Sequence, residues 1–376
     1  MNSMLKPCPE WPRWFDAKRP RSNSTPVALN NLAVHTRRLI PFKQGDCTDA
    51  CVGTLLLAAG VSHPEDILFK DLTFIAFLDV TPDRWFEFTY RDSDYFPELS
   101  AQLGAVFRRG QAFAFDQFTS ELDHLLDKGM PVAITVDHWS YEPSQTYRKT
   151  HWPHSLILEG RDSGAHTYSY LDPFPRFDVV GSVSRDGLMG WCDAPELGDM
   201  RFRYFYLLQA DHLEAGDDAY LRRAWQTTLR HNVERMLSGN RIGTQLYGVA
   251  GIRRTADSLE EWIDCEWALG CPVRQVGDDL LDIGANRMGH AGWLMRVASV
   301  IQAGLLPRLG LEFHRIGEYW NTVSAICSLA GDPDGVRSSG MREAFILRKF
   351  REMPSFIRTI ADREERVLQE LTSLLC

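Results

Sequence analysis

Three residues whose types could form a nucleophilic site occur in the order Cys47, His154 and Asp172. Cys47 stands at an expected helix start, His154 opens an apolar run, and Asp172 ends the next strand-like run before Pro173. A thiol nucleophile, an imidazole base and a carboxylate that orients the imidazole together perform acyl-transfer chemistry. The trio therefore predicts a cysteine-nucleophile enzyme.

The helix start is the feature that favours Cys47 as the nucleophile. The thiolate is the attacking species, and the N-terminus of a helix lowers cysteine pKa through its partial positive charge and free N–H groups. The same N–H groups can hold the oxyanion of a tetrahedral intermediate. We expect His154 to take the thiol proton and to return it to the leaving group.

Each member of the trio also has a structural alternative. Cys51, one turn beyond Cys47, is expected to be a small buried apolar residue. His151 lies three positions before His154 and could replace it as the base. An aspartate before a proline, as in Asp172–Pro173, is also common in turns. The three residues are therefore informative mainly in combination.

Cysteine and histidine also bind metals, but their spacings here form no familiar zinc site. Cys47 and Cys51, His151 and His154, and Cys265 with Cys271 do not combine into a four-ligand pattern. The glycine-rich stretch 243–251 lacks the preceding strand of a phosphate loop and indicates a helix boundary instead. We expect neither a metal nor a bound cofactor.

Composition and charge exclude several classes of protein. A chain of 376 residues with 44% hydrophobic side chains can fill two cores, and its net charge of −9 argues against a nucleic-acid binder. The chain shows no signal peptide and no run of about 18 apolar residues that would predict a membrane span. The eight cysteines have no regular framework, which favours reduced thiols and a cytoplasmic protein.

The hydrophobic pattern divides the chain into an α+β part and a helical part. Helices are expected from about residue 46 to 60 and from 115 to 128, followed by strands at 131–137, 155–160, 167–172 and 203–209. Beyond residue 210 the pattern predicts helices at 218–238, 244–265, 285–306, 312–330 and 354–375. We therefore expect an N-terminal arm (1–25), an α+β domain (26–210) and an all-α domain (211–376) that together border the active site.

These residues resemble those of the butirosin biosynthesis protein H-like family, papain-like acyltransferases with an appended helical domain. In the first half, the resemblance rests on the Asp46–Cys47 helix start, the segment 129–147, His154 and Asp172–Pro173. In the second half, it rests on the segment 251–259 and on the Tyr319–Trp320 helix. It implies a papain-like α+β fold with Cys47, His154 and Asp172 as the catalytic triad.

The resemblance also implies a substrate class. An acyl group would pass from the phosphopantetheine thioester of an acyl or peptidyl carrier protein, through a cysteinyl thioester, to an amine acceptor in the biosynthesis of a secondary metabolite. The phosphopantetheine would arrive on the substrate, so no resident cofactor is implied. Within the resembling segment, Asp137 and Tyr141 are assigned to substrate binding.

The trio is also similar to that of bacteriocin-leader peptidases, and this similarity concerns the oxyanion hole. In those enzymes a Gln six positions before the cysteine contributes to the oxyanion hole, whereas this chain has Pro41 there. We therefore assign that role to Gln44, which requires the loop to bring its amide back toward Cys47.

Two other functions are consistent with the same residues. A cysteine hydrolase, either a thioesterase or a peptidase, would use water in place of the amine to resolve the acyl-enzyme. A non-catalytic binding module would keep the fold without turnover, although retention of all three residue types argues against it.

Overall fold

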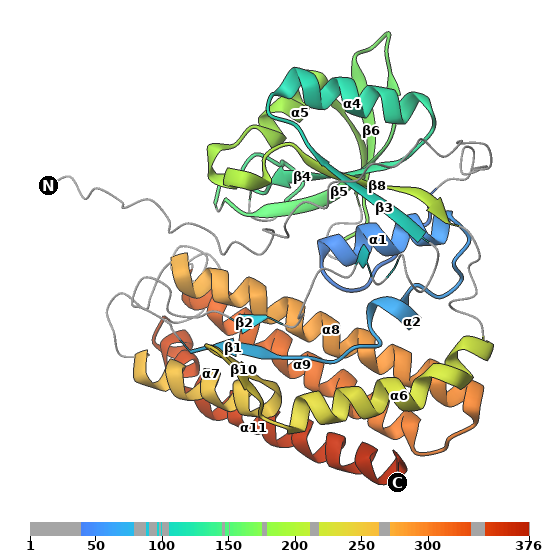
Figure 1. Cartoon of the computed structure of the whole chain (residues 1–376). Helices are drawn as coiled ribbons and strands as arrows, with labels where there is room; N and C mark the ends of the chain where they lie inside the picture. The colour runs from blue at the N-terminus through green and yellow to red at the C-terminus, as the bar shows by residue number, and fades with distance from the viewer. Residues whose placement is uncertain are drawn as a thin grey trace, which may run out of the picture.

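The computed structural model describes residues 39–78, 88–89, 96–97, 99, 105–144, 147–149, 151–174, 179–210, 218–262, 271–331 and 343–375. The expected N-terminal arm, residues 1–25, lies outside these ranges. The described chain combines helices with two antiparallel sheets, so the expected α+β class is confirmed. Its layers, from one end to the other, are helices, the larger sheet, further short helices and a group of long helices (Figure 1).

The larger sheet has six strands in the order β3-β8-β4-β5-β6-β7, and all neighbours are antiparallel. Its strands are β3 (Ala105–Gln111), β4 (Val132–Asp137), β5 (Pro153–Asp162), β6 (Thr167–Asp172), β7 (Val179–Ser184) and β8 (Arg203–Ala210). The four strands expected from the sequence are confirmed, and β3 and β7 are additions. β5 begins earlier than expected, so His154 lies inside the strand, opposite Val136.

One helix covers one face of this sheet and two helices cover the other. α1 (Cys47–Ala58) packs its apolar side chains against Ala133, Ile157 and Leu171 on the first face. α4 (Phe115–Asp127) and α5 (Arg185–Cys192) share a core with the alternate residues of the same strands on the second face. Because side chains alternate across a strand, both faces of the sheet are buried.

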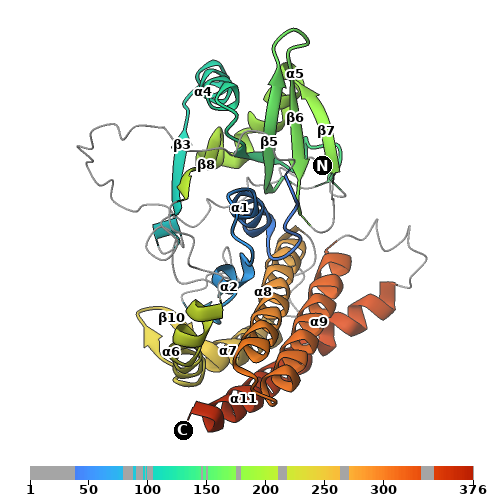
Figure 2. The ribbon, with the colours of Figure 1, turned by 90° about the vertical axis from the view of Figure 1, so that its right-hand side faces the viewer.

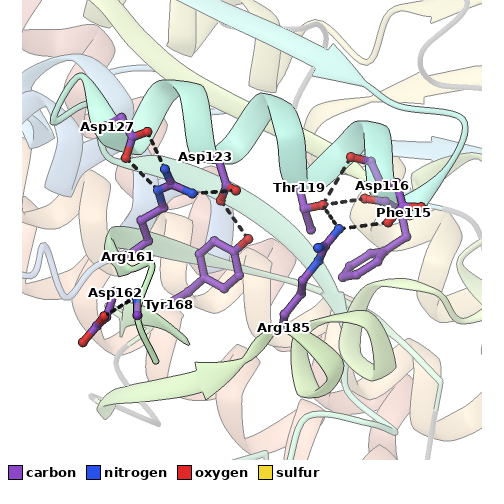
Figure 3. A network of polar contacts seen from close by, with 10 residues as sticks. Phe115, Asp116, Thr119, Asp123, Asp127, Arg161, Asp162, Tyr168 and Arg185 are labelled. Carbon is purple, nitrogen blue, oxygen red and sulfur yellow. Dashed lines mark hydrogen bonds and ion pairs between the residues drawn. The ribbon is translucent and has the colours of Figure 1, made fainter. Parts of the chain in front are cut away.

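A network of charged side chains fastens α4 to the β5–β6 hairpin (Figure 3). Arg161 of β5 makes two hydrogen bonds to Asp127 and an ion pair of 2.7 Å with Asp123. The hydroxyl of Tyr168 donates to the other oxygen of Asp123 at 2.9 Å. These contacts are largely exposed, so they align the layer rather than supply most of its stability.

Long helices dominate the second half of the chain, as expected. They are α6 (Asp218–Leu237), α7 (Gly248–Trp262), α8 (Cys271–Ile301), α9 (Leu306–Ala330) and α11 (Glu343–Leu375). The predicted starts of α8 at residue 285 and of α11 at residue 354 are wrong, because their buried stripes extend upstream through Leu280 and Phe350. Pro354 lies inside α11 rather than at its start.

Two glycines allow α8 and α9 to pack closely. A Cβ atom at Gly284 would lie 3.0 Å from the carbonyl oxygen of Gly317, and one at Gly317 would lie 2.7 Å from that of Gly284. Glycine at both positions therefore permits an approach of the two backbones that any larger residue would prevent.

A short segment from the first half of the chain is built into the helical part. This segment, residues 69–77, follows α2 (Glu65–Leu68) and contains β1 (Ile75–Phe77). β1 pairs with β2 (Phe88–Thr89) and with β10 (Gln245–Tyr247), which pairs in turn with β9 (Arg241–Ile242). Figure 2 shows α1 and α2 between the six-stranded sheet and the long helices.

A buried ion pair holds this segment against the long helices. Arg287 of α8 and Glu364 of α11 are fully buried and form two hydrogen bonds, at 2.9 and 3.1 Å. Arg287 also donates to the carbonyl oxygen of Thr73 at 2.9 Å, and the indole of Trp320 donates to Glu364 at 3.3 Å. One guanidinium thus joins residues 69–77 to α8 and α11.

Among the described residues, no helix is both long enough and apolar enough to cross a membrane. The longest helices carry charged residues along most of their length, for example Arg287 and Arg296 in α8.

We predict that Arg287→Ala lowers the free energy of unfolding by about 3–5 kcal/mol, because Glu364 would keep a buried charge without its cationic partner. Urea unfolding followed by far-UV circular dichroism would measure the change. Arg253→Ala is the matched control, since Arg253 pairs with Asp362 and Glu365 at the surface and should cost less than about 1 kcal/mol.

The double variant Arg287→Met with Glu364→Leu should lose less than Arg287→Ala, because it removes both charges and fills their volume. If the double variant proves less stable than the single one, the pair itself stabilises the fold, and the cost of an orphaned carboxylate is not the main effect.

Candidate functional site

Cys47 is the first residue of α1, as its sequence predicted. Asp46 is the N-cap: its carboxylate accepts from the N–H of Asp49 at 2.7 Å, and the Asp49 carboxylate accepts from the N–H of Asp46 at 3.3 Å. Gly45 precedes the cap with φ = 79°, a left-handed conformation that favours glycine. This capping box fixes where the helix begins and so fixes the position of Cys47.

The surroundings of Cys47 favour its neutral thiol. Burial raises the pKa of the Cys47 thiol well above its ordinary value, and the carboxylates of Asp46, Asp282 and Asp172 raise it further. The backbone N–H of Ser155 acts in the opposite direction. The direction of the shift is thus opposite to the lowered pKa expected from the helix start, because burial and the carboxylates disfavour the thiolate.

Cys51 behaves as a core residue. It is fully buried, and burial raises the pKa of its thiol well above the ordinary value. Its side chain packs in the core between α1 and the sheet. A thiol without solvent access in this core is poorly suited to attack a substrate.

His154 and Asp172 lie on adjacent strands and are directly hydrogen-bonded. The distance from His154 Nε2 to Asp172 Oδ2 is 2.8 Å, and both side chains are at most 1% exposed. Asp172 also accepts from the hydroxyl of Tyr141 at 3.0 Å and from the N–H of Phe174 at 3.1 Å. A buried carboxylate with these partners fixes the orientation of the imidazole.

The structure brings Cys47 to the start of β5 but not into direct contact with His154. Ser155, whose backbone N–H lowers the pKa of the Cys47 thiol, is the next residue after His154. Within the described part of the chain, no hydrogen bond joins that sulfur to the His154 ring. Such bonds often tighten only when substrate binds, so this arrangement is consistent with a loose pair before binding.

Tyr141 and Asp137 both lie deeper than a direct substrate contact requires. Tyr141 is fully buried behind the His154–Asp172 pair, and its hydroxyl is bonded to Asp172. Burial also raises the pKa of this hydroxyl, so it remains a hydrogen-bond donor at neutral pH. Substrate binding by either residue stays a prediction, while the geometry indicates that each positions a neighbouring group.

Asp137 holds a second histidine at the same end of the sheet. Its fully buried carboxylate accepts from His151 Nδ1 at 2.7 Å and from the N–H groups of Trp139 and Trp152 at 3.3 and 3.0 Å. His151 is 35% exposed, and its ring stacks on that of Trp139 with centroids 4.7 Å apart. The site therefore contains two imidazole–carboxylate pairs, one buried and one at the surface.

A third histidine was missed by the sequence reasoning. The ring of His138 lies 4.6 Å from that of His154, and its Nδ1 hydrogen-bonds to the Ser144 hydroxyl at 2.5 Å. The sequence signal for His138 was its position directly after the strand that ends at Asp137. Residues that follow strands at one edge of a sheet lie close together in the fold.

The proposed oxyanion residue Gln44 is exposed and lies in the loop before Gly45. Its contribution to an oxyanion hole stays a prediction. The backbone N–H groups in the first turn of α1 lie beside Cys47, because Cys47 is the first residue of that helix. These groups are the second candidates for donors to the oxyanion. In the described ranges, no three His, Cys, Asp or Glu side chains are arranged as a metal site.

The comparison with protein families gives one match. Residues 46–173, which run from the N-cap of α1 to the proline after Asp172, match the family described as "Butirosin biosynthesis protein H, N-terminal". No curated protein sequence gives a significant match to the chain. The matched segment contains all three members of the predicted trio.

We predict that alkylation of Cys47 by iodoacetamide accelerates about tenfold per pH unit from pH 7 to 9, without levelling off. A thiol with a raised pKa stays protonated over this range, so the reactive thiolate fraction keeps increasing. Peptide mass spectrometry should find the label on Cys47, lost in Cys47→Ala and kept in Cys51→Ala. A rate that levels off below pH 8, or label on Cys51, would contradict the assignment.

We predict that His154→Ala reduces turnover by at least about 100-fold, the lower range for loss of a positioned acid–base group. Asp172→Asn should keep more activity, because the carboxylate orients the ring without exchanging protons with the substrate. Initial rates of Cys47 acylation would measure both effects, with His151→Ala as the control. Equal loss of acylation in His151→Ala and His154→Ala, with both variants folded, would refute the choice of base.

Proposed function

Because residues 46–173 match the butirosin biosynthesis protein H N-terminal family, we propose that the chain is a papain-like cysteine acyltransferase of secondary metabolism. The acyl donor would be the phosphopantetheine thioester of an acyl or peptidyl carrier protein, and the acceptor would be an amine. The family match supports a biosynthetic enzyme. The transfer chemistry rests on the site.

The observation that carries the proposal is the buried 2.8 Å hydrogen bond between His154 and Asp172 beside the helix start of Cys47. In acylation, His154 takes the Cys47 proton and the thiolate attacks the donor carbonyl carbon. The new C–S bond replaces the donor C–S bond, and the proton passes from His154 to the departing pantetheine sulfur. Helix N–H groups at the start of α1 would hold the oxyanion formed between these steps.

The raised pKa of the Cys47 thiol suits an enzyme whose nucleophile stays unreactive until the acyl donor binds. A neutral thiol is a poor nucleophile and is also less easily oxidised than a thiolate. Activation would then require substrate to exclude water and to bring the sulfur toward His154. The N–H of Ser155 would stabilise the thiolate at that moment, because it already acts to lower the pKa of the Cys47 thiol.

Both parts of the molecule would contribute to the site. We assign residues 26–210 to the papain-like domain and 211–376 to the helical domain. Asp282 of α8 belongs to the second domain, yet its carboxylate acts on the pKa of Cys47 in the first. This electrostatic effect supports an active site bordered by both domains. The lack of a regular cysteine framework supports a cytoplasmic location for the enzyme.

The loop that leads into β5 offers a docking point for the carrier protein. Arg148 and Lys149 are exposed, and the N–H of Arg148 donates to the carbonyl oxygen of Trp139 at 3.0 Å. The pair therefore lies beside the Trp139–His151 stack on the segment before His154. Two cations at this place would attract an acidic carrier protein to a chain that is acidic as a whole.

Incubation with acyl-carrier-protein thioesters of several chain lengths tests the proposal. We expect the acyl mass on Cys47, measured by intact and peptide mass spectrometry, followed by an amide product when an amine is added. Cys47→Ala should show neither mass change. Release of free acid at the same rate with and without amines would instead show a hydrolase, and no acyl-enzyme from any donor would favour a binding module.

Charge reversal tests the carrier docking separately. Arg148→Glu with Lys149→Glu should slow acylation from a carrier protein by about tenfold at low salt, with a smaller effect at high salt. Acylation from an N-acetylcysteamine thioester should be unchanged. Arg222→Glu with Arg223→Glu on α6 is the control, and equal losses with both donors would mean that the loop shapes the site itself.

A further inference from the structure

We propose that His151, oriented by Asp137, is a second base that removes the extra proton from an amine acceptor arriving as its ammonium form. The inference rests on the proposed acyl transfer and assigns its second step to a separate histidine. It also names the acceptor class, a basic amine that binds as a cation against Trp139, His151 and Glu196. We call these three residues the acceptor rim.

The geometry of His151 is that of a base fixed in one tautomer. Its Nδ1 lies 2.7 Å from the fully buried Asp137 carboxylate, which holds the proton on that nitrogen and leaves Nε2 as the acceptor. Asp137 is itself held by two backbone N–H groups, so it cannot turn away from the ring. A side chain that is only one-third exposed still has a path for protons to water.

The other groups around His151 favour a cationic ligand. Trp139 is 38% exposed and stacks on the imidazole, and an indole face attracts ammonium groups. Glu196 approaches from the 3₁₀ helix Pro195–Met200, with its carboxylate 3.8 Å from His151 Nδ1. The acceptor rim thus combines an aromatic face with an exposed carboxylate.

Two cations, Arg148 and Lys149, lie three and two positions before His151 in the sequence. The Arg148 guanidinium lies 5.0 Å from the centre of the Tyr147 ring, and Lys149 is exposed. Asp137 faces His151 from β4, and Glu196 faces it from the 3₁₀ helix. The negative charges of these two carboxylates balance the positive charges of Arg148 and Lys149.

The sheet places His151 near the acyl-enzyme. Asp137 is opposite Pro153 in the register, and the preceding residue Val136 is opposite His154. Both imidazole–carboxylate pairs therefore lie at the same end of β4 and β5, where the backbone N–H of Ser155 acts on the pKa of Cys47.

The proton balance of the second step requires two bases when the acceptor is an ammonium ion. The acceptor must lose two protons in forming the amide. One passes through His154 to the sulfur of Cys47 as the C–S bond breaks and the C–N bond forms. The other goes to Nε2 of His151 and then to water, which restores both histidines.

His151→Gln tests this division of labour with two acceptors that differ only in the free amine. Nα-acetyl-lysine amide offers a side-chain amine with a pKa of about 10.4, and Nε-acetyl-lysine amide offers an α-amine with a pKa of about 8. Single-turnover reactions would start from Cys47 acylated by an N-acetylcysteamine thioester. Transfer to each amine would be followed from pH 6.5 to 10.

We expect His151→Gln to acylate at the wild-type rate, to transfer to Nα-acetyl-lysine amide about tenfold more slowly at pH 7, and to approach the wild-type transfer rate at pH 10. The loss for Nε-acetyl-lysine amide should be smaller at pH 7. His63→Gln is the matched control, because His63 is 37% exposed and has Glu65 as its partner at 3.0 Å. It should leave both rates unchanged.

An unchanged transfer rate, a loss that does not depend on pH, or an equal loss of acylation would each overturn the role of His151. Failure of wild-type Cys47 to carry an acyl group at all would overturn the proposed acyl transfer, and mass spectrometry of the wild type distinguishes that result from the others.

Discussion

The buried pair of Arg287 and Glu364 is the interaction on which the arrangement of the two halves depends. Two fully buried charges are tolerated only because each is hydrogen-bonded, and one of these bonds reaches back to the carbonyl of Thr73. The neighbouring residues of that segment are held in the same way: His290 contacts the carbonyl oxygen of Phe69 at 2.9 Å, and Asn232 donates to that of Lys70 at 2.7 Å. These hydrogen bonds therefore fix the segment after α2 against α8. They also limit where α1 can lie, because α1 comes directly before α2 in the chain.

The catalytic candidates depend on a second constraint, the antiparallel register of β4, β5 and β6. That register brings the ends of three strands together and with them two carboxylates that would be costly to bury alone. Asp172 is satisfied by an imidazole, the Tyr141 hydroxyl and one backbone N–H, and Asp137 is satisfied by an imidazole and two backbone N–H groups. Polar groups that a core would normally exclude become a rigid frame for His154 and His151.

Electrostatics then separates the functions of groups that look alike in the sequence. Burial and nearby carboxylates raise the pKa of the Cys47 thiol, so the thiol remains neutral despite its position at a helix start. His154 is enclosed by aromatic rings, whereas His151 keeps contact with water beside Trp139. One imidazole is thus suited to a proton that stays within the site, and the other to a proton that must leave.

The sequence by itself determined the local elements of this protein. The capping signal at Asp46, the strand-like runs that became β4, β5 and β6, and the choice of Cys47, His154 and Asp172 all depend on short-range pattern. Only the tertiary structure decided where α8 and α11 begin, since their upstream turns form against partners distant in sequence, such as α9. It also decided the contact of His138 with His154, the pairing of His151 with Asp137 and the raised pKa of Cys47. These follow from register, burial and long-range charge, none of which is encoded in the spacing of neighbouring residues.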